Sequence, residues 1–458
     1  MTEPTASADS GFLPLELSDV IIDEYKLDTR TLKSCSLVCR SWYFRSRQHL
    51  FRSFRLDLDN VQRVSRANNE VDLRSHEDDV DYLINEVFRS PSTSFPLPNI
   101  ATFVQQLDLR VYESWAFFRI LGSRTKLDQF PHLQDMSLTV SCLSQDERLA
   151  SSIADIISKF DTVPLRTLTL DSFLGGSKNF LDVLCALPTS LSSLRSLKLK
   201  HIIERDTTEQ LWANNLRILL ADFMKDHSGS QSNERPHLLE LVIEGDRHSH
   251  DALRGYILEP LFIGPSPFFK VDQLQRLTMP LFSSGFTRTS LFPFLPNLTH
   301  LTFTMDEVQT RHRSGWGSGP ATFPVLSETM TAPGAIPSLR VLTIKFMEPG
   351  LFSWLYGTKP DPRGGFNRKG IRQTLDRGLM KLFVHYRDLR RSHGQQEPGE
   401  QEQRENGLGG LERVELHYSH SQSHESDTPH SPTPELQLDP TTCFPTASSV
   451  GCVEFVVI

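Results

Sequence analysis

The 458-residue sequence lacks features that several classes of protein require. No apolar run approaches the roughly 18–20 residues needed to cross a bilayer. The first ten residues, MTEPTASADS, have neither the basic region nor the apolar core of a signal peptide. The six cysteines contain no Cys-x-x-Cys pair and are scattered, so neither a zinc site nor a disulfide framework is indicated. We therefore expect a protein of the cytoplasm, the nucleus or both.

Positive charge and catalytic motifs are also missing. The formal net charge is −8, so no global basic field favours nucleic acid. Phosphate-binding loops, dinucleotide-binding turns, zinc-protease helices and nucleophile elbows are all absent from the sequence. We expect no catalytic residue, no cofactor, no metal site, and no nucleic-acid or membrane partner. A hydrolase whose site is built without such a motif is a disfavoured alternative.

Residues 12–56 predict a compact three-helix unit. Apolar side chains recur at helical spacing from Leu13 to Ile21, and Pro14 suits the first helical position. Asp28 is a good N-cap for a second helix, and Trp42 lies on a third, arginine-rich helix. We expect the second helix to direct Leu32, Cys35 and Val38 inward. A unit this small can hardly bury all its apolar residues, so part of that surface should meet a partner or the rest of the chain.

The same residues carry a family resemblance. Leu13-Pro14, Glu16-Leu17, Ile21-Ile22 and the run from Cys35 to Trp42 (CSLVCRSW) closely resemble an F-box of the fungal type. Such a motif docks on a Skp-type adaptor, and through it on a cullin, in an SCF-type ubiquitin ligase. The resemblance implies the following adaptor-binding residues: Leu13, Pro14, Leu17, Val20, Ile21, Leu32, Cys35, Val38 and Trp42.

A second pattern, apolar-x-x-apolar-x-apolar, recurs along the remaining chain. Copies begin at Val104, Leu133, Leu165, Leu194, Leu238, Leu274, Leu298, Leu339 and Leu411, with a last candidate at Val450. Between copies, amphipathic helices are predicted at 146–160, 208–224 and 369–391, and another helix precedes the series at 76–89. Spacing up to Leu339 varies from 24 residues (Leu274 to Leu298) to 44 (Leu194 to Leu238). The alternation of strand and helix indicates repeats that must stack to bury their apolar side.

This pattern resembles leucine-rich repeats from about 101 to 417. It departs from the family because the expected Asn or Cys is Tyr112, Ser141, Phe173 and Ile202 in the first four copies. We therefore predict an α/β fold in which a three-helix F-box-like unit precedes an irregular leucine-rich-repeat solenoid. The predicted division is a disordered N-terminus (1–11), the F-box-like module (12–56), a linker helix region (57–100), the array (101–417) with flexible insertions at about 306–335 and 392–410, a disordered segment (418–449) and a terminal strand (450–458).

Parallel strands of this kind would align the residues that flank their apolar positions on one open face. The candidate substrate-binding residues on that face are Asp108, Arg110, Asp171, Lys198, Lys200, Glu244 and Lys345. Each could equally belong to a solvated strand face, and only their alignment suggests binding. We interpret the chain as a non-catalytic substrate receptor of a ubiquitin ligase. The alternative is a leucine-rich-repeat interaction scaffold without a ligase role.

Overall fold

The computed structural model of the chain describes a core of helices and strands separated by gaps. The described residues are 14–57, 100–111, 130–140, 163–171, 193–200, 237–244, 269–280, 295–305, 330–331, 336–346, 368–394, 411–418 and 443–457. The helices predicted at 76–89, 146–160 and 208–224 lie outside these residues, as do Leu13 and the N-terminal segment 1–11. None of the helices in the described part combines the length and apolar character needed to cross a membrane.

Three helices open the described chain: α1 (Leu15–Glu24), α2 (Thr29–Cys35) and α3 (Arg40–Leu50). Pro14 precedes α1 as its N-cap residue, one position earlier than predicted. Asp28 caps α2 as expected, because its carboxylate accepts the backbone N–H groups of Arg30 at 3.0 Å and Thr31 at 3.1 Å. The Thr31 hydroxyl donates to the same carboxylate, and these hydrogen bonds lower the pKa of Asp28. The three-helix prediction therefore agrees with the structure.

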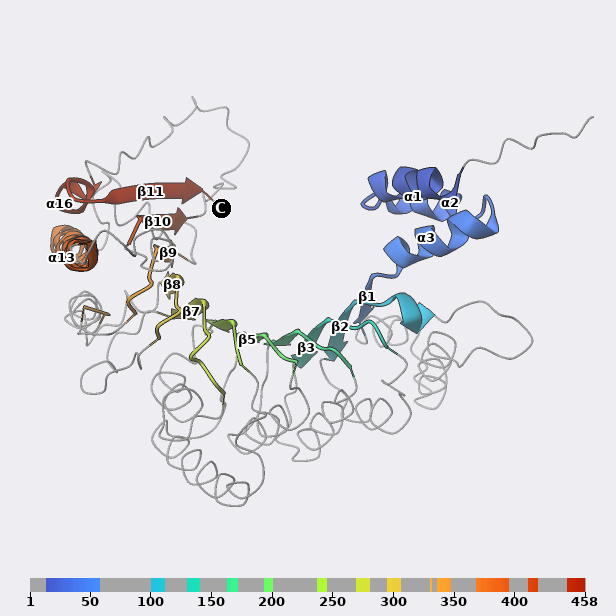
Figure 1. The fold of residues 1–458 in the computed structure, drawn as a ribbon, viewed down its shortest axis with the longest axis horizontal. Helices are drawn as coiled ribbons and strands as arrows, with labels where there is room; N and C mark the ends of the chain where they lie inside the picture. The colour runs from blue at the N-terminus through green and yellow to red at the C-terminus, as the bar shows by residue number, and fades with distance from the viewer. Residues whose placement is uncertain are drawn as a thin grey trace, which may run out of the picture.

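Eleven parallel strands follow in one sheet, and their order across the sheet is their order in the sequence. They are β1 (Ser53–Asp57), β2 (Gln106–Val111), β3 (Asp135–Val140), β4 (Thr167–Asp171), β5 (Ser196–Lys200), β6 (Glu240–Glu244), β7 (Arg276–Pro280), β8 (His300–Met305), β9 (Val341–Phe346), β10 (Arg413–Tyr418) and β11 (Cys452–Val457). The short helix η1 (Ile100–Phe103) precedes β2. Figure 1 shows the strands following one another along an arc, with α1–α3 at the β1 end.

The apolar triplets form the buried side of this sheet. In the nine copies from Val104 to Leu416 every position is buried, the most exposed being Leu411 at 7 %. The first residue of each triplet lies two positions before its strand, and the other two point inward from it. In-register pairing aligns them from strand to strand, as in Leu107 with Met136 and Met136 with Leu168. The register is therefore constant although the intervals between strands vary.

A repeated backbone arrangement joins each strand to the next. The carbonyl of the residue just before one strand accepts two consecutive N–H groups at the start of the following strand. Gln105, for example, accepts from Gln134 at 2.8 Å and Asp135 at 3.0 Å. The same arrangement uses the carbonyls of Arg52, Gln134, Arg166, Arg195, Leu239, Gln275, Thr299 and Arg340. These shared hydrogen bonds satisfy backbone donors that the sheet would otherwise leave unpaired as each strand begins.

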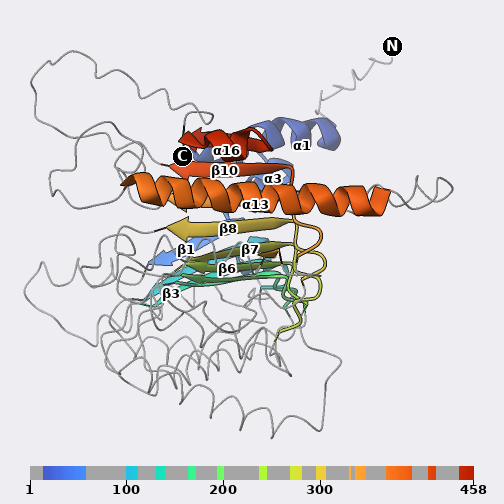
Figure 2. The same cartoon turned by 90° about the vertical axis from the view of Figure 1, so that its left-hand side faces the viewer.

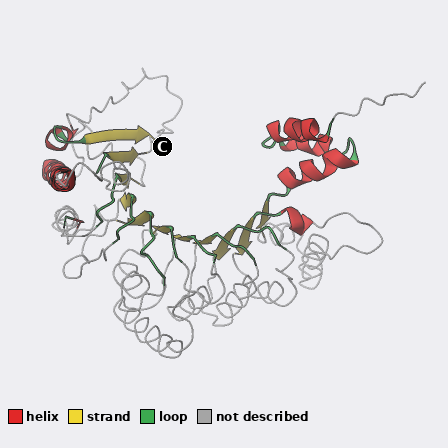
Figure 3. Ribbon diagram, viewed as in Figure 1, coloured by secondary structure: helices red, strands yellow, loops and turns green. Residues whose placement is uncertain are grey.

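Two further helices, α13 (Arg368–Gly394) and α16 (Pro445–Ser448), lie at the β9–β11 end (Figures 1 and 3). The buried carboxylate of Asp376 on α13 accepts the backbone N–H groups of Thr446 at 3.3 Å and Ala447 at 2.8 Å, so one helix caps the other. The predicted helix at 369–391 is confirmed, and its Leu375, Leu379, Leu382, Phe383 and Tyr386 are buried.

Three expectations need correction. Val38 does not point inward but is 63 % exposed, because α2 ends at Cys35 and the chain turns before α3. The segment expected to be disordered through 449 is ordered from Cys443, since α16 buries Phe444 and Ala447. The insertion expected from 392 begins as the last turn of α13, which extends to Gly394. Most of 306–335, together with 395–410 and 419–442, lies outside the described residues.

Candidate docking surfaces

The helical unit has a very small core. Among its described residues the buried hydrophobic side chains are Ile22, Leu32 and Cys35, and the serines Ser18 and Ser46 are buried beside them. On α1 the inward positions are thus Ser18 and Ile22, four residues apart on one side of the helix. The apolar residues between them point elsewhere. The core is too small to hold the hydrophobic side chains that the unit carries.

We refer to the exposed apolar side chains of this unit collectively as the apolar docking surface. It consists of Leu15, Leu17, Val20, Ile21, Tyr25, Leu27, Leu37, Val38 and Phe44, each between 38 % and 91 % exposed. Leu17, Val20 and Ile21 fall at i, i+3 and i+4 and therefore share one side of α1. Among the described residues, the large hydrophobic side chains that are exposed all belong to this unit. Such a concentration of exposed apolar residues is typical of an interaction site.

The sequence-predicted adaptor-binding residues divide into two groups in the structure. Pro14, Leu17, Val20, Ile21 and Val38 are exposed, and Trp42 is half-buried. Leu32 and Cys35 are 1 % and 8 % exposed and belong to the core, so they act by holding the helices together. Leu13 lies outside the described residues. The sequence did not predict as site residues Leu15, Tyr25, Leu27, Leu37 and Phe44. Their apolar character was a usable signal, because the unit has little room for a core.

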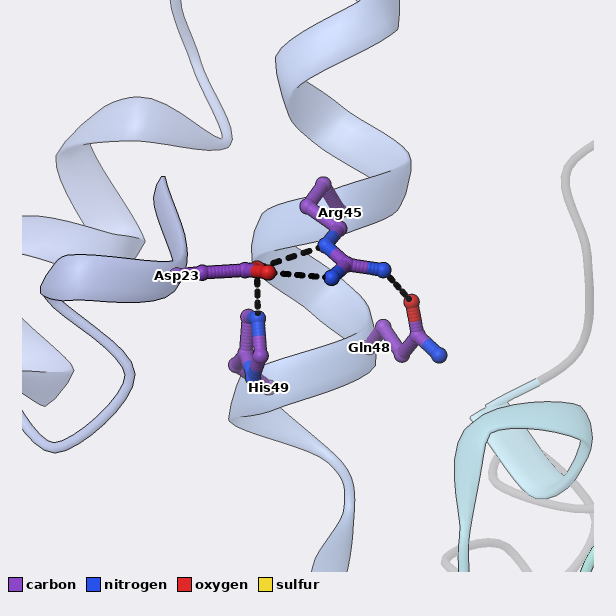
Figure 4. A network of polar contacts seen from close by, with 4 residues as sticks. All are labelled: Asp23, Arg45, Gln48 and His49. Atoms are coloured by element: carbon purple, nitrogen blue, oxygen red, sulfur yellow. Dashed lines mark hydrogen bonds and ion pairs between the residues drawn. The ribbon is translucent and has the colours of Figure 1, made fainter. Parts of the chain in front are cut away.

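A polar network joins α1 to α3 (Figure 4). The Arg45 guanidinium donates to both carboxylate oxygens of Asp23 and, at 3.1 Å, to Gln48. His49 Nε2 lies 2.7 Å from Asp23 Oδ1. Arg45 and His49 lower the pKa of Asp23 to about 2, and Asp23 in turn raises the pKa of Arg45. The network therefore links α1 to α3 through Asp23, near the C-terminal end of α1.

A second candidate surface is the open face of the sheet, which we call the charged strand face. It contains the first, third and fifth residues of the strands, opposite to the buried triplets. All seven predicted substrate-binding residues lie on this face and are half-buried. Asp171 pairs in register with Lys200, and Lys200 with Glu244. Lys345 lies apart on β9, between Thr304 and His417 in the register.

Most charges on the β1–β6 part of this face are paired with one another. Asp108 Oδ2 lies 3.1 Å from Arg110 and 3.7 Å from Arg55. Two more ion pairs join Lys198 to Glu240 at 3.4 Å and Lys200 to Glu244 at 3.2 Å. Glu240 also accepts a hydrogen bond from Ser196 at 2.6 Å. These pairs give the face a patterned rather than a uniform charge.

The sequence analysis missed the row formed by the first residue of each strand. In this row Arg276 of β7 is followed in register by His300 of β8, Val341 of β9 and Arg413 of β10. Partial burial and the neighbouring Arg276 and Arg413 lower the pKa of His300. The two-residue period of a strand was a usable signal for this row, because the first residue of a strand shares a face with its third and fifth residues.

Neither surface, as far as the structure describes it, has the arrangement of a metal centre. In the part of the chain that the structure describes, no group of three His, Cys, Asp or Glu side chains is placed to hold a metal ion. No protein-family model matches the chain. No curated protein is significantly similar to it. The two surfaces therefore supply the functional argument.

Proposed function

We propose that the chain is the substrate-recognition subunit of an SCF-type ubiquitin ligase. In this proposal α1–α3 form an F-box that docks on a Skp-type adaptor and, through it, on a cullin. The charged strand face binds a target protein. The chain itself is not an enzyme: it acts in the cytoplasm, the nucleus or both by raising the effective concentration of the target near the conjugating machinery.

The apolar docking surface carries the proposal. The helical unit buries Ile22, Leu32 and Cys35 but exposes nine apolar side chains of larger or comparable size. Its surface is therefore suited to binding a partner. The exposed stripe Leu17, Val20 and Ile21 lies within the residues whose order resembles an F-box. The resemblance and the exposure are independent observations, since the first uses residue types and the second uses the packing of the helices.

We further propose that the strands belong to an irregular leucine-rich-repeat solenoid. Eleven parallel strands in sequence order, with an apolar triplet at each of β2 to β10, support this interpretation. The repeated carbonyl that accepts two N–H groups also supports a stacked repeat unit. A constant register over variable intervals agrees with irregular connections around a regular strand core.

One observation favours the alternative, an interaction scaffold without a ligase role. The chain runs from α3 into β1 with only Phe51 and Arg52 between them, and the Arg52 carbonyl accepts N–H groups from Gln105 and Gln106, each at 2.9 Å. The helical unit is thus continuous with the sheet and could serve only as its end cap. A cap of this kind would need its apolar side chains covered by the sheet, whereas nine are exposed in the described part of the chain.

The experiment is a binding assay between full-length chain and purified Skp-type adaptor. Leu17→Glu/Val20→Glu places two charges on the exposed side of α1, where they should not disturb Ile22. If both residues are anchors of the interface, the dissociation constant should rise roughly a hundredfold or more. Glu16→Gln/Glu24→Gln, which changes two exposed residues of the same helix, should bind like wild type.

Circular dichroism must first establish that both variants are folded. A folded Leu17→Glu/Val20→Glu variant that binds the adaptor as tightly as wild type would reject the assignment of these residues. Wild-type chain that fails to bind any Skp-type adaptor would reject the ligase role and leave the scaffold.

A further inference from the structure

The helix α13 differs in charge from the rest of the chain. The whole chain has a formal net charge of −8. Residues 368–394 contain eight Lys or Arg residues and only two acidic ones, Asp376 and Asp388, a net charge of +6. The other residues therefore sum to −14. A single helix of an acidic protein thus concentrates positive charge.

The exposed side of α13 is more basic than its composition indicates. Asp376 is buried and holds the N-terminus of α16, so it contributes no charge to the surface. Asp388 is exposed and lies 3.7 Å from Arg387. Among the α13 residues whose burial the structure describes, the cationic ones at exposed or half-exposed positions are Arg372, Arg377, Lys381, Arg387 and Arg391. We call these five residues the basic ridge.

The spacing along the ridge is unfavourable for the helix by itself. Arg377 and Lys381 are four residues apart, and like charges at this spacing destabilise a helix by about 0.2–0.5 kcal/mol. Arg387 and Arg391 are also four residues apart, but Asp388 lies 3.7 Å from Arg387 and three residues before Arg391, so it offsets their repulsion. The first turn contains no acidic residue to complement the positive end of the helix dipole. A helix face that is only solvated is more stable when positive and negative side chains alternate along it. An anionic partner would reverse both unfavourable effects.

The structure also restricts what that partner is. The apolar side of α13, including Leu379, Leu382 and Phe383, is buried, so the helix cannot insert it into a lipid surface. A long nucleic acid would extend beyond the ridge and meet the field of a chain that is otherwise strongly acidic. A short acidic polypeptide meets neither obstacle. The ridge spans about 28 Å from Arg372 to Arg391, which matches roughly eight or nine extended residues.

We propose that the basic ridge of α13 binds an acidic segment of a partner protein. The helix α13 lies at the β9–β11 end, and Figure 2 shows its full length facing the viewer. It is at the opposite end of the strand series from α1–α3 (Figure 1). The inference is therefore independent of the proposed ligase role, and either can fail without the other.

The test uses full-length chain and a fluorescent peptide of alternating Glu and Asp, with a Gly/Ser peptide of equal length as the neutral probe. Fluorescence anisotropy is measured at low and at physiological salt. Arg377→Glu/Lys381→Glu/Arg391→Glu should weaken binding of the acidic peptide about tenfold or more. Lys26→Glu/Arg30→Glu/Lys33→Glu changes the net charge equally on exposed positions of the helical unit, and should change binding by less than about threefold.

Binding of the acidic peptide that weakens with salt and is lost in the ridge variant, but not in the control variant, supports the proposal. The proposal is overturned if wild type does not bind the acidic peptide, or if both triple variants lose binding equally. It is also overturned if wild type binds a duplex DNA oligonucleotide more tightly than the acidic peptide. Circular dichroism of the ridge variant establishes that lost binding is not lost folding.

Discussion

Arg45 of α3 donates two guanidinium hydrogen bonds to the carboxylate of Asp23 on α1. One of them runs from Arg45 Nε to Asp23 Oδ1 at 2.6 Å. This pair holds two of the three helices that present the apolar docking surface. Because Asp23 is 38 % exposed, solvent screening limits the contribution of the pair to less than about 1 kcal/mol. We expect its effect to be local, on the angle and the opening of α1.

Asp23→Asn should therefore destabilise α1 by about 0.2–1 kcal/mol, because the amide keeps the size of the side chain but loses the charge. Amide hydrogen exchange of α1 at neutral pH measures the effect, which should appear as faster exchange in α1 and α3. Glu24→Gln, an exposed change on the same helix, is the control and should exchange like wild type. Equal protection of wild type and Asp23→Asn would contradict a structural role for the pair.

The same pair predicts a pH dependence. The pKa of Asp23 is lowered from 3.8 to about 2, so the unfolded chain binds the proton more tightly than the folded one. The stabilisation is fully present above about pH 4 and is lost as the pH falls towards 2. Wild type should therefore lose its advantage over Asp23→Asn across this window, as followed by exchange or thermal melting. An advantage that persists unchanged at pH 2 would contradict the assignment.

The buried triplets predict a large effect in the middle of the sheet. Leu168 of β4 is 0 % exposed, so Leu168→Ala should destabilise the fold by about 2–5 kcal/mol through lost burial and a residual cavity. Thr169→Ala, one residue further and on the half-exposed face, should cost less than about 1 kcal/mol. Chemical denaturation measures both. Equal midpoints would show that β4 does not contribute to the core as described.

Tyr386 and Ile336 provide a test at the other end of the chain. The buried Tyr386 hydroxyl donates to the Ile336 carbonyl at 3.0 Å, and its burial raises the pKa of Tyr386. Ile336 has φ = 48°, an uncommon conformation for a β-branched residue. Tyr386→Phe should destabilise the fold by about 0.5–1.5 kcal/mol, because the buried carbonyl loses one of its two donors and keeps only the backbone N–H of Leu339 at 3.4 Å. Tyr25→Phe, at an exposed tyrosine, should melt like wild type, and a Tyr386→Phe variant that does so too would contradict the prediction.

Gly451 provides another test, since it lies directly against the ring of Phe383 on α13. A methyl group at this position would overlap the ring, so Gly451→Ala should destabilise the packing of α13 against the residue that precedes β11 by about 1–3 kcal/mol. Adding Phe383→Leu removes part of the obstructing ring and should recover some of the loss. Strictly additive losses in a double-mutant cycle would show that the two sites do not touch.

The sequence predicted the sheet well because a strand's two faces are fixed by its period. Leu107 and Leu109 point inward for the same reason that Asp108 and Arg110 do not, whatever the length of the connecting segment. It could not predict the packing within the helical unit. There, helical spacing groups Leu17 with Ile21 but does not say that Ser18 and Ile22 face the core. It also placed Val38 inside, because the end of α2 at Cys35 depends on the turn that follows.

The sequence also did not predict the polar contacts between residues far apart in the chain. Asp376 reads as a solvated carboxylate on a basic helix, yet it is buried because the N–H groups of Thr446 and Ala447 need an acceptor. Thr446 and Ala447 follow Asp376 by 70 and 71 positions in the sequence. The basic ridge follows from the same contact, since only the burial of Asp376 leaves the surface of α13 almost purely cationic.

The most direct test of the central claim is to mix full-length chain with purified Skp-type adaptor and measure the mass of the product by light scattering during size exclusion. We expect a one-to-one complex, with hydrogen exchange slowed in α1–α3 and unchanged in β4 and β5. Separate elution of the two proteins at concentrations well above a micromolar, or a complex whose protection falls on the strands and not on α1–α3, would contradict it.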